Sequence, residues 1–200
     1  MRGIIRTLAL FFFSLGGFGL LLLGVLDSSF LFMPLGNDLL VVALTAAHRQ
    51  RMLYYVLMAT AGSTLGSEFT RWASARGGEK TLEERGKSRR VAYVEKTVKD
   101  RGGLALAAAA LMPPPFPFTL FLIAAGALHY PRRKMLTIIA ASRALRFGVE
   151  ASLALIYGRG IIRLARTPWV ENFILVLVVI SVAGSVWSLV NLIRKSRGHR

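Results

Sequence analysis

The sequence predicts an all-α integral membrane protein with about four transmembrane helices and two re-entrant helical hairpins in an inverted repeat. Hydrophobic residues make up 54% of the 200 residues and charged residues only 18%. A water-soluble domain has about 45–50% apolar and about 25% charged residues. Several apolar stretches are long enough to cross about 30 Å of hydrocarbon, and two others are broken by proline. The composition and these two kinds of segment together favour an integral membrane protein.

The chain is strongly basic, with 26 Lys and Arg against 10 Asp and Glu. Such a charge suits either nucleic acid or an anionic membrane surface. The apolar excess decides for the membrane, because nucleic-acid-binding proteins do not carry several stretches of membrane-spanning length. We therefore expect no nucleic-acid partner. The sequence contains no cysteine, which excludes disulfides, thiolate metal sites and cysteine nucleophiles.

We expect uncleaved transmembrane helices over residues 4–26, 52–75 and 135–158, and a fourth near the C-terminus. The first follows basic residues, as a signal peptide does, but its apolar run is long and no small-residue cleavage site follows it. In the second helix, Gly62 and Gly66 form a small-xxx-small pattern. That face should pack against another helix.

Two apolar segments, residues 28–47 and 103–128, contain prolines that prevent a single straight helix. The breaks lie at Pro34 in the first segment and at Pro113, Pro115 and Pro117 in the second. Broken backbone at membrane depth is tolerated only where protein or water covers it. We therefore interpret both segments as re-entrant hairpins, with kinked full spans as the alternative.

The chain matches itself at an offset of 83 residues, which predicts an internal repeat. The match pairs Pro34 with Pro117, Arg49 with Arg132, Met52-Leu53 with Met135-Leu136, and Arg76-Gly77 with Arg159-Gly160. Each unit crosses the membrane once, so the copies have opposite orientation, as in many secondary transporters. The substrate path is then expected where the two broken segments face each other.

These observations predict the organisation of the whole chain. An N-terminal transmembrane helix (1–26) precedes a central domain (27–158), and a C-terminal transmembrane helix (171–193) precedes a basic tail (194–200). In the central domain, repeats 27–77 and 103–160 are joined by a basic amphipathic loop, 78–102. With both termini in the cytoplasm of a bacterial cell, the basic residues concentrate on the cytoplasmic side of the inner membrane, as the positive-inside rule requires.

The third predicted helix carries three charged residues on one face. Arg143, Arg146 and Glu150 are spaced by three and four residues, and a charge at the bilayer centre costs at least about 2.5–3.5 kcal/mol. Two guanidinium groups against one carboxylate leave a positive charge that suits a phosphate. Arg143 and Arg146 are therefore the candidate substrate-binding residues. A purely structural Arg146–Glu150 pair is the alternative.

Four acidic residues, Asp27, Asp38, Glu68 and Glu150, are candidates for charge balance or proton coupling. A carboxyl group withdrawn from water exchanges its proton closer to neutral pH, which suits coupling to a proton gradient. Helix capping is the alternative for Asp38, and an interfacial position for Asp27. Glu68 stands three residues before Arg71 and could pair with it, but we expect Arg71 to extend to the cytoplasmic surface instead.

Nothing in the sequence indicates hydrolysis or a metal. Ser63 is not in a G-x-S-x-G turn, and no H-E-x-x-H occurs. His48, His129 and His199 have no metal-ligand spacing. We expect no catalytic residue, no metal and no cofactor.

The stretch 62–78, GSTLGSEFTRWASARGG, resembles the signature G-x-x-x-G-(D)-x-x-x-Y-W-x-G-R-x-G of the DedA family, also called the SNARE-associated or VTT-domain family. Residues 26–38 resemble the first re-entrant loop of that family, with an acid before and after a proline. Residues 125–135 resemble its stretch AG-x-x-x-M-x-x-R-R-F. The resemblance covers most of the chain.

The resemblance implies two facing hairpins that move phospholipids or polyprenyl phosphates between leaflets, dependent on the proton gradient. Asp27 and Asp38 match the acidic positions of the family. Where many members carry arginines in the second loop, this chain has Met112 and Phe118. The R-x-x-R of the third helix instead resembles that of a YqaA-like branch.

The predicted function is an inner-membrane lipid transporter or scramblase that supports membrane homeostasis and is not an enzyme. Its partners are membrane lipids with an anionic headgroup or a polyprenyl phosphate. The alternatives are a polyprenyl-phosphate phosphatase and a membrane assembly protein that binds partners through residues 77–101 without transport. The sequence leaves the lipid, the direction of movement and homo-oligomer formation open.

Overall fold

The computed structural model describes residue 7 and residues 11–28, 36–85, 89–112 and 118–165, and every element in them is helical. The helices are α2 (Gly17–Ser28), α3 (Gly36–Ala47), the 3-10 helix η1 (Arg49–Arg51), α4 (Met52–Arg85), α5 (Arg89–Leu111), α6 (Phe118–Ala127) and α7 (Arg132–Ala165). The all-α prediction is confirmed for this part of the chain. No helix in these ranges combines the length and the hydrophobicity needed to cross a membrane.

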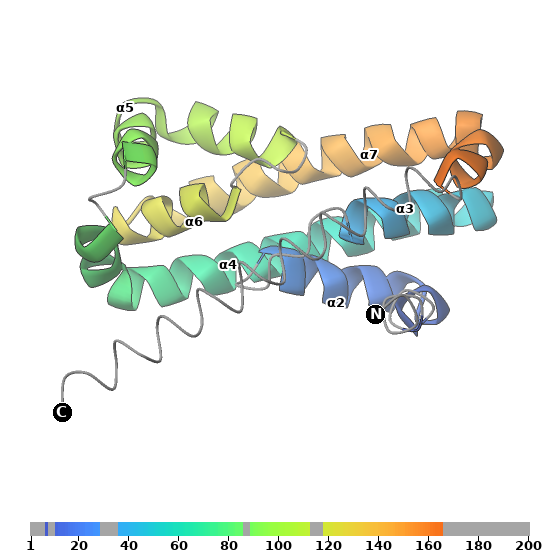
Figure 1. Ribbon diagram of the computed structural model, residues 1–200, viewed down its shortest axis with the longest axis horizontal. Coiled ribbons are helices and arrows are strands. Elements are labelled where there is room, and N and C mark those ends of the chain that lie inside the picture. The colour runs from blue at the N-terminus through green and yellow to red at the C-terminus, as the bar shows by residue number, and fades with distance from the viewer. Residues whose placement is uncertain (1–6, 8–10, 29–35, 86–88, 113–117, 166–200) are drawn as a thin grey trace.

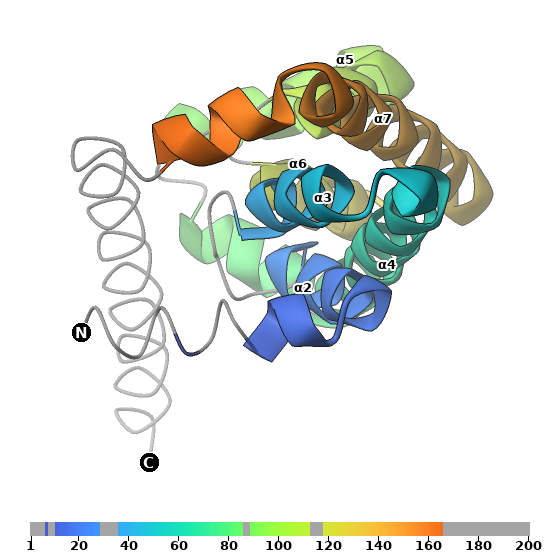
Figure 2. The same cartoon turned by 90° about the vertical axis from the view of Figure 1, so that its right-hand side faces the viewer.

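Two antiparallel helices, α4 and α7, form the long axis of the molecule (Figure 1). Each has 34 residues. The pair α2–α3 approaches their middle from one end and the pair α5–α6 from the other (Figure 1). Each long helix packs against the second helix of the opposite pair, α4 against α6 and α7 against α3. In the turned view, α3 and α6 lie between α7 and α2 (Figure 2).

The element order is the same in both halves: two shorter helices, a corner and a 34-residue helix. Both corners carry an arginine, and each arginine contacts the opposite long helix. The Arg49 guanidinium donates a hydrogen bond to the Leu155 carbonyl of α7. Arg132 Nε lies 2.8 Å from Glu68 Oε1 of α4. The two corners therefore tie α4 and α7 together near both ends of their contact.

Close backbone contact joins α2 to α4. A Cβ atom at Gly24 would lie 2.8 Å from the Ser63 backbone nitrogen, and one at Gly66 would lie 2.9 Å from Ser28 Cβ. Hydroxyl groups add hydrogen bonds, since Ser28 Oγ lies 2.8 Å from Ser63 Oγ and Thr70 Oγ1 donates to the Ser28 carbonyl at 2.8 Å. The prediction that the Gly62–Gly66 face packs against another helix is confirmed, and that helix is α2.

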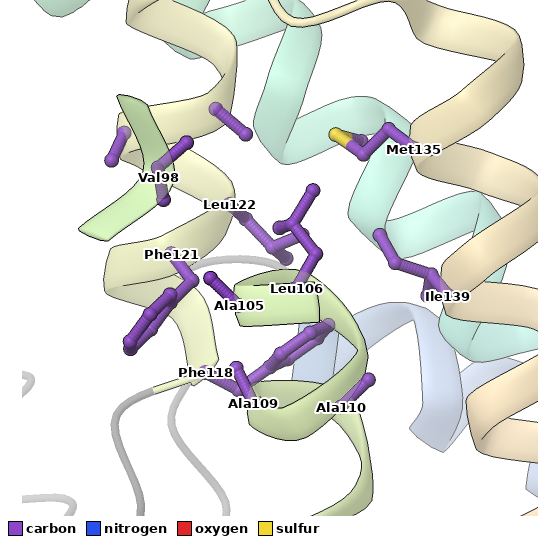
Figure 3. Close-up of a cluster of buried hydrophobic side chains, with 12 residues drawn as sticks. Val98, Ala105, Leu106, Ala109, Ala110, Phe118, Phe121, Leu122, Met135 and Ile139 are labelled. Atoms are coloured by element: carbon purple, nitrogen blue, oxygen red, sulfur yellow. The ribbon is translucent and has the colours of Figure 1, made fainter. Parts of the chain in front are cut away.

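The buried apolar side chains form two separate clusters. One joins α5, α6 and α7 through side chains that include Leu106, Leu122, Met135 and Ile139 (Figure 3). The other joins α2, α3, α4 and α7 through side chains that include Leu20, Val41, Ala59 and Phe147. Helix α7 contributes to both clusters, so it holds the two halves together.

The first predicted span, residues 4–26, is not one straight helix. The chain turns at Gly16, whose φ of 56° is left-handed, a conformation that glycine adopts at little cost. Residues 17–28 then form α2, which runs antiparallel to α3 (Figure 1). Among the described residues, α2 is therefore the antiparallel neighbour of α3, and the predicted first arm of 28–47 falls mostly outside them.

The described residues of the predicted amphipathic segment 78–102 are helical. Its first residues continue α4 to Arg85, and residues from Arg89 onward belong to α5. Within α5 the chain bends at Gly102, with a φ of 25°, where the Tyr130 ring packs against the backbone. Helical hydrogen bonding thus continues well beyond the apolar stretches that set the predicted boundaries.

Some predicted features lie outside the described residues. They are the four proline breaks (Pro34, Pro113, Pro115 and Pro117), the C-terminal helix 171–193 and the tail 194–200. The predicted helices 52–75 and 135–158 lie within α4 and α7, which extend further at their C-terminal ends.

The α2–α4 contact predicts that Gly24→Ala destabilises the protein. The added methyl group must displace backbone atoms of α4, and overpacking of this kind costs about 1–3 kcal/mol. Gly148→Ala is the control, because a Cβ there meets nothing within 4 Å and alanine favours a helix by about 1 kcal/mol. Denaturant unfolding of the purified protein measures both changes. A loss for Gly148→Ala as large as that for Gly24→Ala would contradict the close contact.

Candidate functional site

The Arg146 side chain is buried, at 8% exposure, and all three of its nitrogen atoms have partners. Nε donates to Glu150 Oε1 at 3.0 Å, and Nη1 donates to the Met112 carbonyl at 2.9 Å. Nη2 donates to Asp38 Oδ2. A guanidinium group keeps its charge in proteins, so burial is tolerated here because these acceptors replace water.

These partners come from the inner ends of both hairpins. Asp38 lies in the first turn of α3, and Met112 directly follows the end of α5. Arg146 itself lies near the middle of α7. The side chain therefore connects the α2–α3 hairpin to the α5–α6 hairpin at the centre of the molecule, where Figure 1 shows their ends meeting.

Arg143, one turn earlier on α7, is buried at 5% exposure. Its guanidinium carbon lies 4.4 Å from the centroid of the Phe118 ring and 5.8 Å from that of Phe147. A guanidinium group over an aromatic face is attracted by the ring quadrupole. Phe118 belongs to the apolar cluster of α5–α7 and Phe147 to the other cluster. Arg143 thus lies between the two cores.

Three carboxylates accompany the two arginines. Asp38 and Glu150 contact Arg146 directly, with side-chain exposures of 14% and 22%. Asp27 lies half-buried at the end of α2. It interacts electrostatically with Arg143 most strongly among the basic residues, and also with Asp38 and Arg146. The sequence predicted a positive charge left over on α7. The structure brings enough carboxylates to these arginines to remove that surplus.

Glu68, the fourth acidic candidate, is not part of this cluster. Its carboxylate accepts two hydrogen bonds of 2.8 Å from Arg71, so Arg71 is paired and does not extend to the surface as we expected, and it also pairs with Arg132. The basic groups that act on it are Arg71 and Arg132. Glu68 therefore connects α4 to the start of α7.

Several buried polar atoms in and beside the central cluster have no hydrogen-bond partner within the described part of the chain. They are Arg143 Nε, Glu150 Oε2, and both the oxygen and the nitrogen of the Asn37 side-chain amide. Asn37 is only 2% exposed and precedes Asp38 in the first turn of α3. Buried polar groups without partners cost about 1–3 kcal/mol each.

Sequence reasoning missed several of these contacts. The Met112 carbonyl and the Phe118 ring surround the arginines, at the positions where the family resemblance would have placed arginines. A backbone carbonyl leaves no signal in the residue pattern. A signal did exist for Asn37, because an amide beside an acid after a proline break is unusual in an apolar segment.

The arrangement suits binding of a polar, charged group in an apolar protein interior. Two guanidinium groups provide donors for phosphate oxygens, and three carboxylates provide acceptors for a cation or hydrogen-bond donors. Among the described residues, no group of His, Asp and Glu side chains is placed to hold a metal ion.

The burial of Arg146 predicts that Arg146→Met destabilises the protein by about 3–5 kcal/mol, because Asp38 and Glu150 remain buried without their charge partner. Arg71→Met is the matched control. Glu68 keeps Arg132 there, so the loss should stay within about 1 kcal/mol. The free energy of unfolding of the purified protein measures both. Equal losses of stability in the two variants would show that the contacts of Arg146 do not stabilise the fold more than an ordinary ion pair does.

No family model, no curated protein and no solved structure matches this chain.

Proposed function

We propose that this protein is a lipid transporter or scramblase of a bacterial inner membrane, related to the DedA family. It moves a lipid with a phosphorylated headgroup between leaflets, while the acyl chains stay in the bilayer. Binding is at Arg143 and Arg146, and the nearby carboxylates balance charge or exchange a proton during the cycle. The protein acts as a multi-pass transporter with its two hairpins re-entrant and its repeats inverted.

One observation carries this proposal: the inner ends of two hairpins from opposite ends of the molecule meet at two buried arginines. Helical hairpins that meet near the midplane are a recurring way to build a substrate site in secondary transporters. Charged groups deep in an apolar protein are costly to keep. A role in binding a charged substrate accounts for that cost.

The outer surface of the long helices supports a location in the membrane. Large apolar side chains are exposed along α4 and α7, among them Leu53 (75%), Leu57 (65%), Leu145 (60%) and Ile156 (71%). Soluble monomers rarely expose extended apolar surfaces of this kind. Arg143 and Arg146 of α7 are buried instead. The middle of this helix therefore turns apolar side chains outward and charged side chains into the protein.

The proposal predicts that Arg143→Gln slows lipid translocation at least about tenfold, since one lost charge contact to a phosphate is worth 1.4 kcal/mol or more. The assay uses purified protein in liposomes with chain-labelled phospholipids and a membrane-impermeant quencher. Arg133→Gln is the control, because Arg133 is exposed on the same helix and should leave the rate unchanged.

Two results would overturn the proposal. One is a wild-type protein that moves no tested lipid faster than protein-free liposomes do. The other is an Arg143→Gln variant with the rate of wild type. Release of phosphate from a lipid pyrophosphate by the purified protein would favour the phosphatase alternative.

A further inference from the structure

One face of α7 is left open by the described part of the protein. Its exposed large side chains include those of Leu145, Val149, Leu153 and Ile156. Helices α3, α4 and α5 all pack against α7, yet this face stays uncovered. In a membrane, such a face meets either lipid or another helix, and its small residues indicate which of the two it suits.

A row of small residues runs along the open face. Ala144, Gly148 and Ser152 follow one another at intervals of four residues, so they lie on one side of the helix. Ser152 is exposed, and a Cβ atom at Gly148 would meet no described atom within 4 Å. The Ser152 hydroxyl group donates to the Gly148 carbonyl at 2.8 Å. Such a row is typical of faces on which two membrane helices pack closely, and Ala144 shows that the row accepts a single methyl group.

The protein already contains one contact of this kind. The row of Gly62 and Gly66 on α4 touches the backbone of α2, and Ser28 and Ser63 form a hydrogen bond across the contact. The row on α7 has the same four-residue spacing, but no described helix covers Gly148. A helix with small residues of its own would complete the contact.

The sequence supplies a candidate helix directly after α7. Residues 173–193 contain no Asp, Glu, Lys or Arg, and a helix of this length extends for about 30 Å. Helix α7 is described to Ala165, and Pro168 follows it, where proline ends or breaks a helix. Two helices joined by so short a connection are usually antiparallel neighbours. The predicted C-terminal helix, 171–193, therefore has both the length and the direction to run back along α7.

The two segments also match in register. Gly184 and Ser188 are spaced by four residues, as the small residues of α7 are. A turn centred on Pro168 places Gly184 at the level of Ser152, because each is 16 residues from that proline. It likewise places Ser188 at the level of Gly148, since both are 20 residues from it. Small residues on both helices let the two backbones approach closely.

We propose that residues 171–193 dock as an antiparallel helix on the open face of α7, with Gly184 and Ser188 against Ser152 and Gly148. The exposed face of α4 fits this helix less well, because large side chains such as Leu57 hold a partner backbone at a distance. The docked helix covers the side of α7 opposite its buried arginines. This inference goes beyond the proposed transport and does not depend on it.

The experiment uses disulfide cross-linking of the full-length protein in its membrane, because the natural chain has no cysteine. The first test pair is Ser152→Cys with Ser185→Cys, and the second is Ile156→Cys with Ser181→Cys. Within one residue, the members of each pair are equally distant from Pro168. A disulfide requires Cα atoms within about 7 Å, so each pair should cross-link within one chain under mild oxidation. Loss of free thiols in the monomer band measures the yield.

Ser152→Cys with Ala183→Cys is the matched control. Ala183 is close to Ser185 in sequence but lies on the opposite side of a helix. The yield should therefore be at least about fivefold lower for this pair, because its Cα atoms are too far apart to be bridged. A second control, Leu57→Cys with Ser185→Cys, tests the exposed face of α4 and should also give a low yield.

Four results would overturn the inference: no cross-link in either test pair, equal yields for the test and Ala183 pairs, a higher yield with Leu57→Cys than with Ser152→Cys, or a cross-linked dimer in place of the monomer. The last result would show that a second copy of the chain covers α7. If one test variant yields no folded protein, the other pair decides alone. Lipid movement is not part of this measurement, so failure of the docking leaves the proposed transport in place.

Discussion

A single buried guanidinium group determines how the rest of this structure is arranged. Arg146 cannot give up its charge, so each of its nitrogen atoms needs an acceptor, and those acceptors lie in three parts of the chain: the start of α3, the end of α5 and the next turn of α7. These contacts set where both hairpins stop along α7. A shift of either hairpin by one turn would remove an acceptor of Arg146. Part of its buried charge would then have no partner in the apolar interior.

The two apolar cores follow from the same constraint. A continuous core would have to pass through the charged centre, so the buried side chains divide into one cluster around α5–α6 and one around α2–α3. Arg143 connects them through the faces of Phe118 and Phe147. Helix α7 contributes to both clusters and carries both arginines. Its displacement would therefore disrupt both apolar cores and the charged centre together.

The residue pattern of the sequence indicated contacts that depend on spacing along a single helix. The pairs Arg146–Glu150 and Glu68–Arg71 follow from helical spacing of four and three residues, and the glycine face of α4 follows from the Gly62–Gly66 pattern. The contact between Asp38 and Arg146 spans 108 residues, and only the packing of α3 on α7 creates it. The turn at Gly16 was missed because apolar runs mark burial, whereas helix ends depend on backbone hydrogen bonds.

The glycine contact between α2 and α4 has a mechanical consequence. The two backbones are in close contact, and hydroxyl groups form hydrogen bonds across it. The helices α2 and α4 therefore have no room to slide past each other and must move as one rigid body. Any separation of the two halves would then have to part α4 from α6 and α7, against which it packs, and α3 from α7. It would also have to break the buried Asp38–Arg146 ion pair, which makes such a separation costly.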